Sequence, residues 1–163
     1  MSDTALVCDT SLLLYLGYIG RLHLLPSLYP TILVPEPVLF ELDVGRSLLP
    51  DIVNPRELGF VLIQSVSQAE IDRLPANRLG EGERAVIALS RQLNAAVAGL
   101  DDRQARQFAI SLGLTVKGVV GLLVDAKRAG FIASAADLLE SLRLSGFRID
   151  HQLLAAALAL AGE

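Results

Sequence analysis

Acidic side chains at four places in the sequence are its best candidates for chemistry. They follow apolar runs directly or lie in helical patterns: Asp9, Glu41, Glu83 and the pair Asp101-Asp102. The carboxyl ends of parallel strands share one edge of a sheet, so carboxylates from distant parts of the chain can meet in one pocket. Such carboxylates repel one another unless a cation joins them, and oxygen ligands suit Mg²⁺ or Mn²⁺. The pattern predicts metal-dependent phosphoryl chemistry, and a nuclease is the leading interpretation.

Asp9 is the strongest single candidate. It directly follows the apolar run at residues 4–8, where a charge is costly unless a partner or a metal ion compensates it. The alternative is that Asp9 caps the helix that follows, a role that is also open to Thr10 and Ser11.

Glu41 and Glu83 also have simple structural explanations. Glu41 lies among apolar residues of a predicted helix, where a solvent-facing glutamate is common. Glu83, like Glu81, stands at a helix start after Gly80, where acids complement the helix dipole. Because Glu81 and Glu83 are two residues apart, at most one of them points well into a shared pocket.

Asp101 and Asp102 follow an apolar run and open a helix that carries Arg103 and Arg106. One aspartate is expected to cap that helix, and the other can face the pocket because adjacent side chains point in different directions. The sequence favours Asp101 for the pocket, since it is nearer the strand end, but does not separate the two. Arg103 or Arg106 is a candidate contact for a substrate backbone, and the alternative is a solvated helix face.

Other catalytic arrangements lack residues that they need. His23 and His151 have no ligand-spaced partners, which argues against zinc. No Ser-His-acid set is evident, and residues 80–83 do not match a phosphate-binding loop. The stretch after Asp9 lacks the second aspartate of a haloacid-dehalogenase phosphatase. A receiver domain, for which Lys117 would be the late lysine, needs an acid pair early in the chain.

The composition limits the function classes. The chain has 163 residues, of which 52% are hydrophobic, and a net charge of −4. That charge argues against simple nucleic-acid binding, but not against a nuclease, because a bound divalent cation recruits phosphate locally. The apolar run at residues 153–161 is shorter than the roughly 20 residues of a membrane-spanning helix. The first residues lack the basic region of a signal peptide, and the single Cys8 suits a reducing cytoplasm.

Apolar runs alternate with helical patterns along the chain. Strands are predicted at residues 4–8, 31–34, 60–63, 95–100 and 115–116. Helices are predicted at residues 11–17, 21–29, 35–44, 80–93, 102–112, 119–129, 134–144 and 151–161, and one more opens at Ser67. Strands separated by helices imply right-handed crossovers. We therefore expect one α/β domain over residues 1–163, a three-layer sandwich whose central, mostly parallel sheet is flanked by helices.

The C-terminal helices, at about residues 119–161, have two possible roles. They complete the core, or they form the contact surface of a homodimer. The high proportion of apolar residues is consistent with such a surface. The leucines in question are Leu138, Leu139, Leu142, Leu153, Leu154 and Leu158.

Taken in order, these segments resemble those of PIN-domain proteins. The resemblance rests on the short motifs at residues 7–14, 34–42, 80–89 and 100–106. The stretches 114–118, 126–132 and 145–149 are similar to a prokaryotic, toxin-like branch of that family. The resemblance covers nearly the whole chain, and the joint order of the motifs carries it, because each motif alone is only moderately specific.

The resemblance implies an acidic Mg²⁺ or Mn²⁺ site that hydrolyses RNA with metal-activated water. By position, Asp9, Glu41 and Glu83 match the first three acids, with Glu81 as an alternate, and Asp101 or Asp102 matches the fourth. Thr10 or Ser11 would hydrogen-bond to metal-bound water or to a carboxylate. Many relatives are toxins of toxin–antitoxin pairs, which dimerise and are neutralised by a small antitoxin protein that inserts into the active-site groove.

The chain departs from the family pattern at three positions. Leu12 stands where this branch commonly has proline, and Glu83 replaces an aspartate, which lengthens the ligand arm. Lys117-Gly118-Val119 stands where a hydroxyl-flanked glycine is usual. The alternative to an active nuclease is therefore a PIN-like module that binds RNA or a protein partner with weak or no cleavage.

Overall fold

A computed structural model describes residues 4–163 of the protein. Five strands form one sheet in the order β3-β2-β1-β4-β5, and every neighbouring pair is parallel. The strands are β1 (Ala5–Cys8), β2 (Thr31–Pro35), β3 (Val61–Gln64), β4 (Ala96–Gly99) and β5 (Thr115–Lys117). The predicted sheet is confirmed, and it is parallel throughout.

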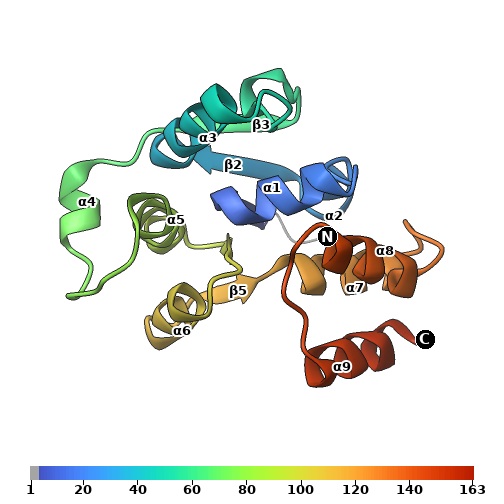
Figure 1. The fold of residues 1–163 in the computed structure, drawn as a ribbon. Helices are drawn as coiled ribbons and strands as arrows, with labels where there is room; N and C mark the ends of the chain where they lie inside the picture. The colour runs from blue at the N-terminus through green and yellow to red at the C-terminus, as the bar shows by residue number, and fades with distance from the viewer. Residues whose placement is uncertain (1–3) are drawn as a thin grey trace.

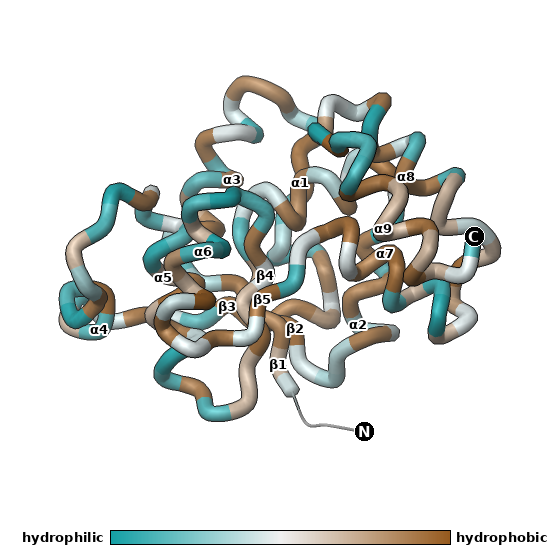
Figure 2. The backbone as a smooth tube through the Cα atoms, turned by 90° about the horizontal axis from the view of Figure 1, so that it is seen from below, coloured by the Kyte–Doolittle hydropathy of each residue, from teal (hydrophilic) through white to brown (hydrophobic). Residues whose placement is uncertain are grey.

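Helices connect the strands and end the chain. They are α1 (Thr10–Tyr18), α2 (Leu24–Leu28), α3 (Glu36–Leu48), α4 (Gln68–Asp72), α5 (Glu81–Gln92), α6 (Arg103–Ser111), α7 (Val119–Arg128), α8 (Ala135–Leu144) and α9 (His151–Ala161), with a short 3₁₀ helix at Pro55–Glu57. The molecule is the three-layer α/β sandwich that the sequence predicts. In Figures 1 and 2, α4 lies at one end of the molecule, and α8 and α9 lie at the other.

The middle strand, β1, is buried along its whole length. It pairs with β2 on one side and with β4 on the other, so that Val7 lies level with Leu33 and Ala98. A strand covered on both faces needs an unbroken apolar run, and Ala5–Cys8 provides one. Figure 2 shows the strands as largely hydrophobic segments at the centre of the fold. Asp9, the first residue after β1, is thereby held at a rigid place.

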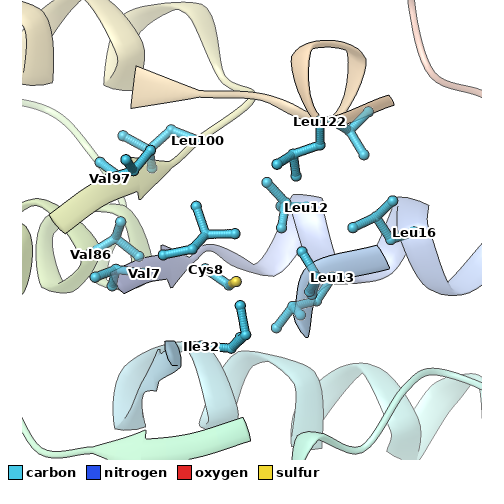
Figure 3. Close-up of a cluster of buried hydrophobic side chains, with 14 of the residues drawn as sticks. Val7, Cys8, Leu12, Leu13, Leu16, Ile32, Val86, Val97, Leu100 and Leu122 are labelled. Atoms are coloured by element: carbon cyan, nitrogen blue, oxygen red, sulfur yellow. The ribbon is translucent and has the colours of Figure 1, made fainter. Parts of the chain in front are cut away.

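The core joins the sheet to helices on both sides of it. Side chains from β1, α1, β2, α5, β4 and α7 meet in the cluster of Figure 3, which includes Val7, Leu12, Ile32, Val86 and Leu122. Helix α5 packs against β1, β2 and β4, while α1 and α2 both contact α7. The residues that end β1 and β4 and that begin α1, α5 and α7 are thus fixed relative to one another.

Several predicted helix ends are confirmed by their hydrogen bonds. Ser67 caps α4 by accepting from the backbone N–H of Glu70, and Asp150 caps α9 by accepting from that of Leu153. Gly130 and Gly146, which follow α7 and α8, have φ values of +80° and +102°. A glycine reaches this conformation at little cost, which explains why both helices stop there.

Two predicted helix boundaries were wrong. The expected helix at residues 21–29 begins only at Leu24, which puts Pro26 in the first turn, where no intrahelical partner is needed for its missing N–H. The helix expected to end near Val44 continues through Gly45 to Leu48. Helix α3 therefore keeps helical hydrogen bonding past its glycine, and the carbonyl of Gly45 accepts from the N–H of Leu49.

The leucines of the last helices divide between two environments. Leu138, Leu139 and Leu142 of α8 are buried in the protein's own core. On α9, Leu154 and Leu158 are partly buried, whereas Leu153 is 42% exposed. In the part of the chain that the structure describes, no helix is long and apolar enough to cross a membrane.

Candidate active site

The candidate site lies where the chain changes direction along the sheet. From β1 the chain moves outward to β2 and β3, and then returns past β1 to β4 and β5. A crevice forms at such a switch point, beyond the carboxyl ends of the two strands that border it. Here those strands are β1 and β4, and the backbone N–H of Asp9 donates to the carbonyl of Gly99 over 3.0 Å. Asp9 and Asp101 therefore follow the two strands that meet at the switch point.

Asp9 is almost fully buried, with 3% of its surface exposed. It occupies the position before α1, but its side chain makes no capping hydrogen bond, so the capping alternative does not explain it. The pKa of its carboxyl is raised to about 7, mainly by burial and also by the charges of Glu83, Glu41 and Asp101, while the backbone N–H of Thr10 opposes the shift. We call Asp9, Glu41, Glu83 and Asp101 the acidic cluster.

Glu41 reaches the cluster from α3. Its carboxylate accepts a hydrogen bond from the hydroxyl of Thr10 over 2.5 Å and another from the backbone N–H of Gly82 over 3.0 Å. The residue is exposed as a whole, but its charged end is tied to the starts of α1 and α5. A free, solvent-facing glutamate would have neither contact.

Glu83 lies in the first turn of α5. Its carboxylate accepts from the backbone N–H of Gly80 over 3.1 Å, which caps the helix start. Its pKa is raised, first by burial and then by the charges of Asp102 and Glu41, against the effect of the Gly80 N–H. Glu81, by contrast, is exposed. Of the two glutamates, Glu83 is the one whose charge interacts with the cluster.

The two neighbouring aspartates have different surroundings. Asp102 caps α6, because its carboxylate accepts from the backbone N–H of Ala105 over 2.9 Å. Asp101 turns the other way, and its Oδ1 accepts from the backbone N–H of Val119 over 2.9 Å. Burial raises the pKa of Asp101, opposed by the Val119 N–H and by the charge of Arg106. Its second oxygen, Oδ2, is buried and has no hydrogen-bond partner among residues 4–163.

The residues that the sequence suggests as substrate contacts do not all lie at the acidic cluster. Thr10 touches the cluster through Glu41, whereas Ser11 is a half-buried residue in the first turn of α1. Arg103 begins α6 and is exposed. Arg106, one turn later, is the arginine whose charge acts on Asp101, and its guanidinium donates to the carbonyl of Leu100 over 2.9 Å.

The donor set suits a hard divalent cation by its chemistry. All four side chains of the acidic cluster offer oxygen, and the buried, unpartnered Oδ2 of Asp101 is an acceptor without a donor. Within residues 4–163, however, no group of three or more His, Cys, Asp or Glu side chains lies close enough together to hold a metal ion. Instead, the carboxylates of Glu41, Glu83 and Asp101 accept from nearby hydroxyl and backbone donors.

Backbone N–H groups are the part of the site that sequence reasoning missed. Gly82 and Val119 donate to Glu41 and Asp101, and both donors lie at the first turn of a helix. The signal in the sequence was a glycine at the first donor, Gly82, and a glycine directly before the second, Gly118. A Cβ at Gly118 would lie 2.7 Å from Oδ1 of Asp101, and one at Gly82 would lie 2.7 Å from both oxygens of Glu41.

Gly82→Ala is expected to displace the Glu41 carboxylate with little effect on stability. Alanine normally stabilises a helix by about 1 kcal/mol relative to glycine, and the atoms that must move are the end of a flexible side chain. We therefore expect thermal stability close to that of the wild type but at least about a tenfold loss of any activity that needs Glu41. Gly45→Ala on α3 is the matched control, because its Cβ would meet only Ile52. Equal activity in both variants would contradict the role of this contact.

Comparison with known proteins identifies one relationship. A family model described as a PIN domain matches residues 5–163, which is nearly the whole chain. Comparisons with curated proteins and with solved structures gave no match.

Proposed function

The chain belongs to the PIN-domain family, and from this membership we propose that it is a metal-dependent endoribonuclease. PIN domains are generally nucleases that use divalent metal ions. The observation that carries the proposal for this chain is Asp9, a buried carboxyl at the switch point whose pKa three other acids help to raise. Burying such a group is costly, and a cation at the cluster would offset that cost.

Asp9, Glu41 and Asp101 would hold Mg²⁺ or Mn²⁺, and Glu83 would assist directly or through water. When bound, the cation would act as a Lewis acid that activates water and neutralises negative charge on the phosphate. The chain's own residues orient the ligands. The Thr10 hydroxyl and the Gly82 N–H fix Glu41, and the Val119 N–H fixes one oxygen of Asp101, which leaves the other oxygen for the site.

A cleavage assay on single-stranded RNA tests the proposal directly. With Mn²⁺ or Mg²⁺ we expect products that carry one phosphate end and one hydroxyl end, and no 2′,3′-cyclic phosphate, because water is the nucleophile. EDTA should stop the reaction. Cleavage that persists in EDTA, or cyclic phosphate ends, would rule out this mechanism.

Two variants should distinguish the role of Asp101 from that of Asp102. Asp102→Ala removes a helix cap and should cost about 1 kcal/mol of unfolding free energy while leaving most of the cleavage activity. Asp101→Asn should instead abolish most of the cleavage with a smaller effect on stability. Urea unfolding and RNA cleavage measured on both proteins check this assignment. The reverse pattern would show that Asp102 serves the site.

A second candidate function is binding without cleavage. It is favoured by the hydrogen bonds that already engage the Glu41 carboxylate. It is also favoured by the finding that, within residues 4–163, no three His, Cys, Asp or Glu side chains lie close enough together to hold a metal ion. Such a protein would bind RNA or a protein partner but show no turnover with either metal. The assay above separates the two functions.

Partners follow from the same proposal. Because the C-terminal segments resemble the toxin-like branch, we also propose that the protein forms a homodimer. We further propose that a small antitoxin protein inhibits it by occupying the active-site groove. Leu144 of α8, which is exposed, and Leu154 and Leu158 of α9, which are partly buried and lie outside the cavity described below, are the surface we propose for the dimer contact.

A further inference from the structure

A second feature lies beside the acidic cluster, on the side of β5. It is a cavity of about 480 Å³ between β5, α7 and α9. This volume falls in the range of small-molecule sites, roughly 300–1,000 Å³. Asp101 contributes to its lining, so the cavity opens next to the carboxylate whose second oxygen is unpartnered.

The cavity has more positive than negative charge, although the chain as a whole is acidic. Its charged lining comprises four cationic and two acidic residues: Arg106, Lys117, Arg128, Arg148, Asp101 and Asp125. That is a balance of +2 in a chain with a net charge of −4. A concave surface lined by one sign of charge attracts ligands of the other sign.

Two of the four basic side chains already have partners within the protein, and the other two form no ion pair. Lys117 pairs with Asp125 over 2.8 Å, and Arg106 donates to the carbonyl of Leu100. Arg128 and Arg148 are exposed, and no carboxylate in residues 4–163 pairs with either of them. Arginine is well suited to phosphate, because its planar group donates two parallel hydrogen bonds.

The remaining walls of the cavity are apolar. Ala156 and Leu160 line it from α9, Val120 and Val124 line it from α7, and Phe147 lies in the segment before α9. Leu160 is 63% exposed and therefore offers apolar surface to a bound ligand. Apolar walls beside two unpaired arginines match a nucleotide, whose base is flat and apolar on its faces and whose phosphate is anionic.

We propose that this cavity binds a nucleotide of single-stranded RNA next to the bond that is cut. Arg128 and Arg148 hold its phosphate, and the α7 and α9 side chains cover its base. The inference rests on the proposed ribonuclease function and names the substrate contact of the same site. It also explains how an acidic protein binds a polyanion, because the positive charge is concentrated where the substrate lies. The apolar walls favour this occupant over an acidic peptide without a flat, apolar group.

Binding measured without metal tests the cavity separately from cleavage. The probe is a short, fluorescently labelled single-stranded RNA, followed by anisotropy in EDTA. The double variant Arg128→Ala/Arg148→Ala should raise Kd at least about tenfold and weaken the salt dependence of binding. Ala156→Trp fills the cavity without changing its charge and should raise Kd about fivefold or more, because a base loses its contact. Arg78→Ala, in the exposed loop before α5, is the matched control and should bind like the wild type.

The outcomes separate this inference from the proposed function. If the cavity variants lose RNA binding while the wild type shows no cleavage with Mn²⁺, the cavity stands and the ribonuclease proposal falls. If cleavage occurs but the cavity variants bind RNA like the wild type, the cavity inference is wrong. It is equally overturned if the wild type shows no RNA binding in EDTA, or if Arg78→Ala weakens binding as much as the double variant. Circular dichroism checks that each variant is folded.

Discussion

Asp9→Asn is expected to abolish metal-dependent RNA cleavage in a protein that remains folded. Asparagine keeps the shape of the side chain but removes the charge that would hold a cation at the switch point. Loss of a partner outside the metal shell typically costs 10-fold to 100-fold, so loss of this ligand should cost more than about 100-fold. Cleavage rates at saturating Mn²⁺ measure the effect.

The control for this variant is Asp51→Asn, which removes an exposed carboxylate outside the acidic cluster and should leave cleavage unchanged. Substantial cleavage by purified, folded Asp9→Asn protein would contradict the proposed mechanism.

The same residue should make the stability of the protein depend on pH. The folded protein raises the pKa of Asp9 from 3.8 to about 7, so the folded state holds its proton more tightly than the unfolded chain does. The unfolding free energy should therefore fall as the pH rises from about 4 to above 7 in EDTA. A shift of this size corresponds to about 4 kcal/mol, at 1.36 kcal/mol per pKa unit. Urea unfolding at pH 5 and pH 8 measures the larger part of this fall.

Asp9→Asn should remove most of this fall and be more stable than the wild type at pH 8. Part of the fall will remain, because the pKa values of Glu83 and Asp101 are raised as well. Asp43→Asn is the control of opposite sign, since hydrogen bonding from Arg56 lowers the pKa of Asp43 and its contribution is present at high pH. A wild type whose stability does not fall between pH 5 and pH 8 would contradict the account of Asp9.

Local patterns were sufficient to predict most of the fold. Four of the five strands were visible as apolar runs, and the short fifth only as Thr115-Val116. Alternation with helices implied parallel pairing, as observed. Glycines with positive φ, such as Gly130 and Gly146, stopped helices where expected. The extension of α3 through Gly45 was missed, because a single glycine lowers helix propensity by only about 1 kcal/mol and packing can outweigh it.

The candidate site was predicted less completely than the fold. The order of the acids along the chain indicated which could meet, since strand ends share an edge. The choice between Asp101 and Asp102 depended on which backbone N–H each side chain reaches, and no pattern in the sequence encodes that. The cavity beside β5 was not foreseen, because Arg128 and Arg148 come from separate segments that only the packing of α7 and α9 brings together.

Titration of Mn²⁺ by calorimetry, on the wild type and on Asp9→Asn at pH 8, tests the central claim most directly. At this pH the Asp9 carboxyl is largely ionised, since its pKa is about 7. We predict saturable binding to the wild type and at least about a tenfold higher Kd for Asp9→Asn. Binding of equal strength to both proteins, or no binding to the wild type, would contradict the assignment of the acidic cluster as a metal site.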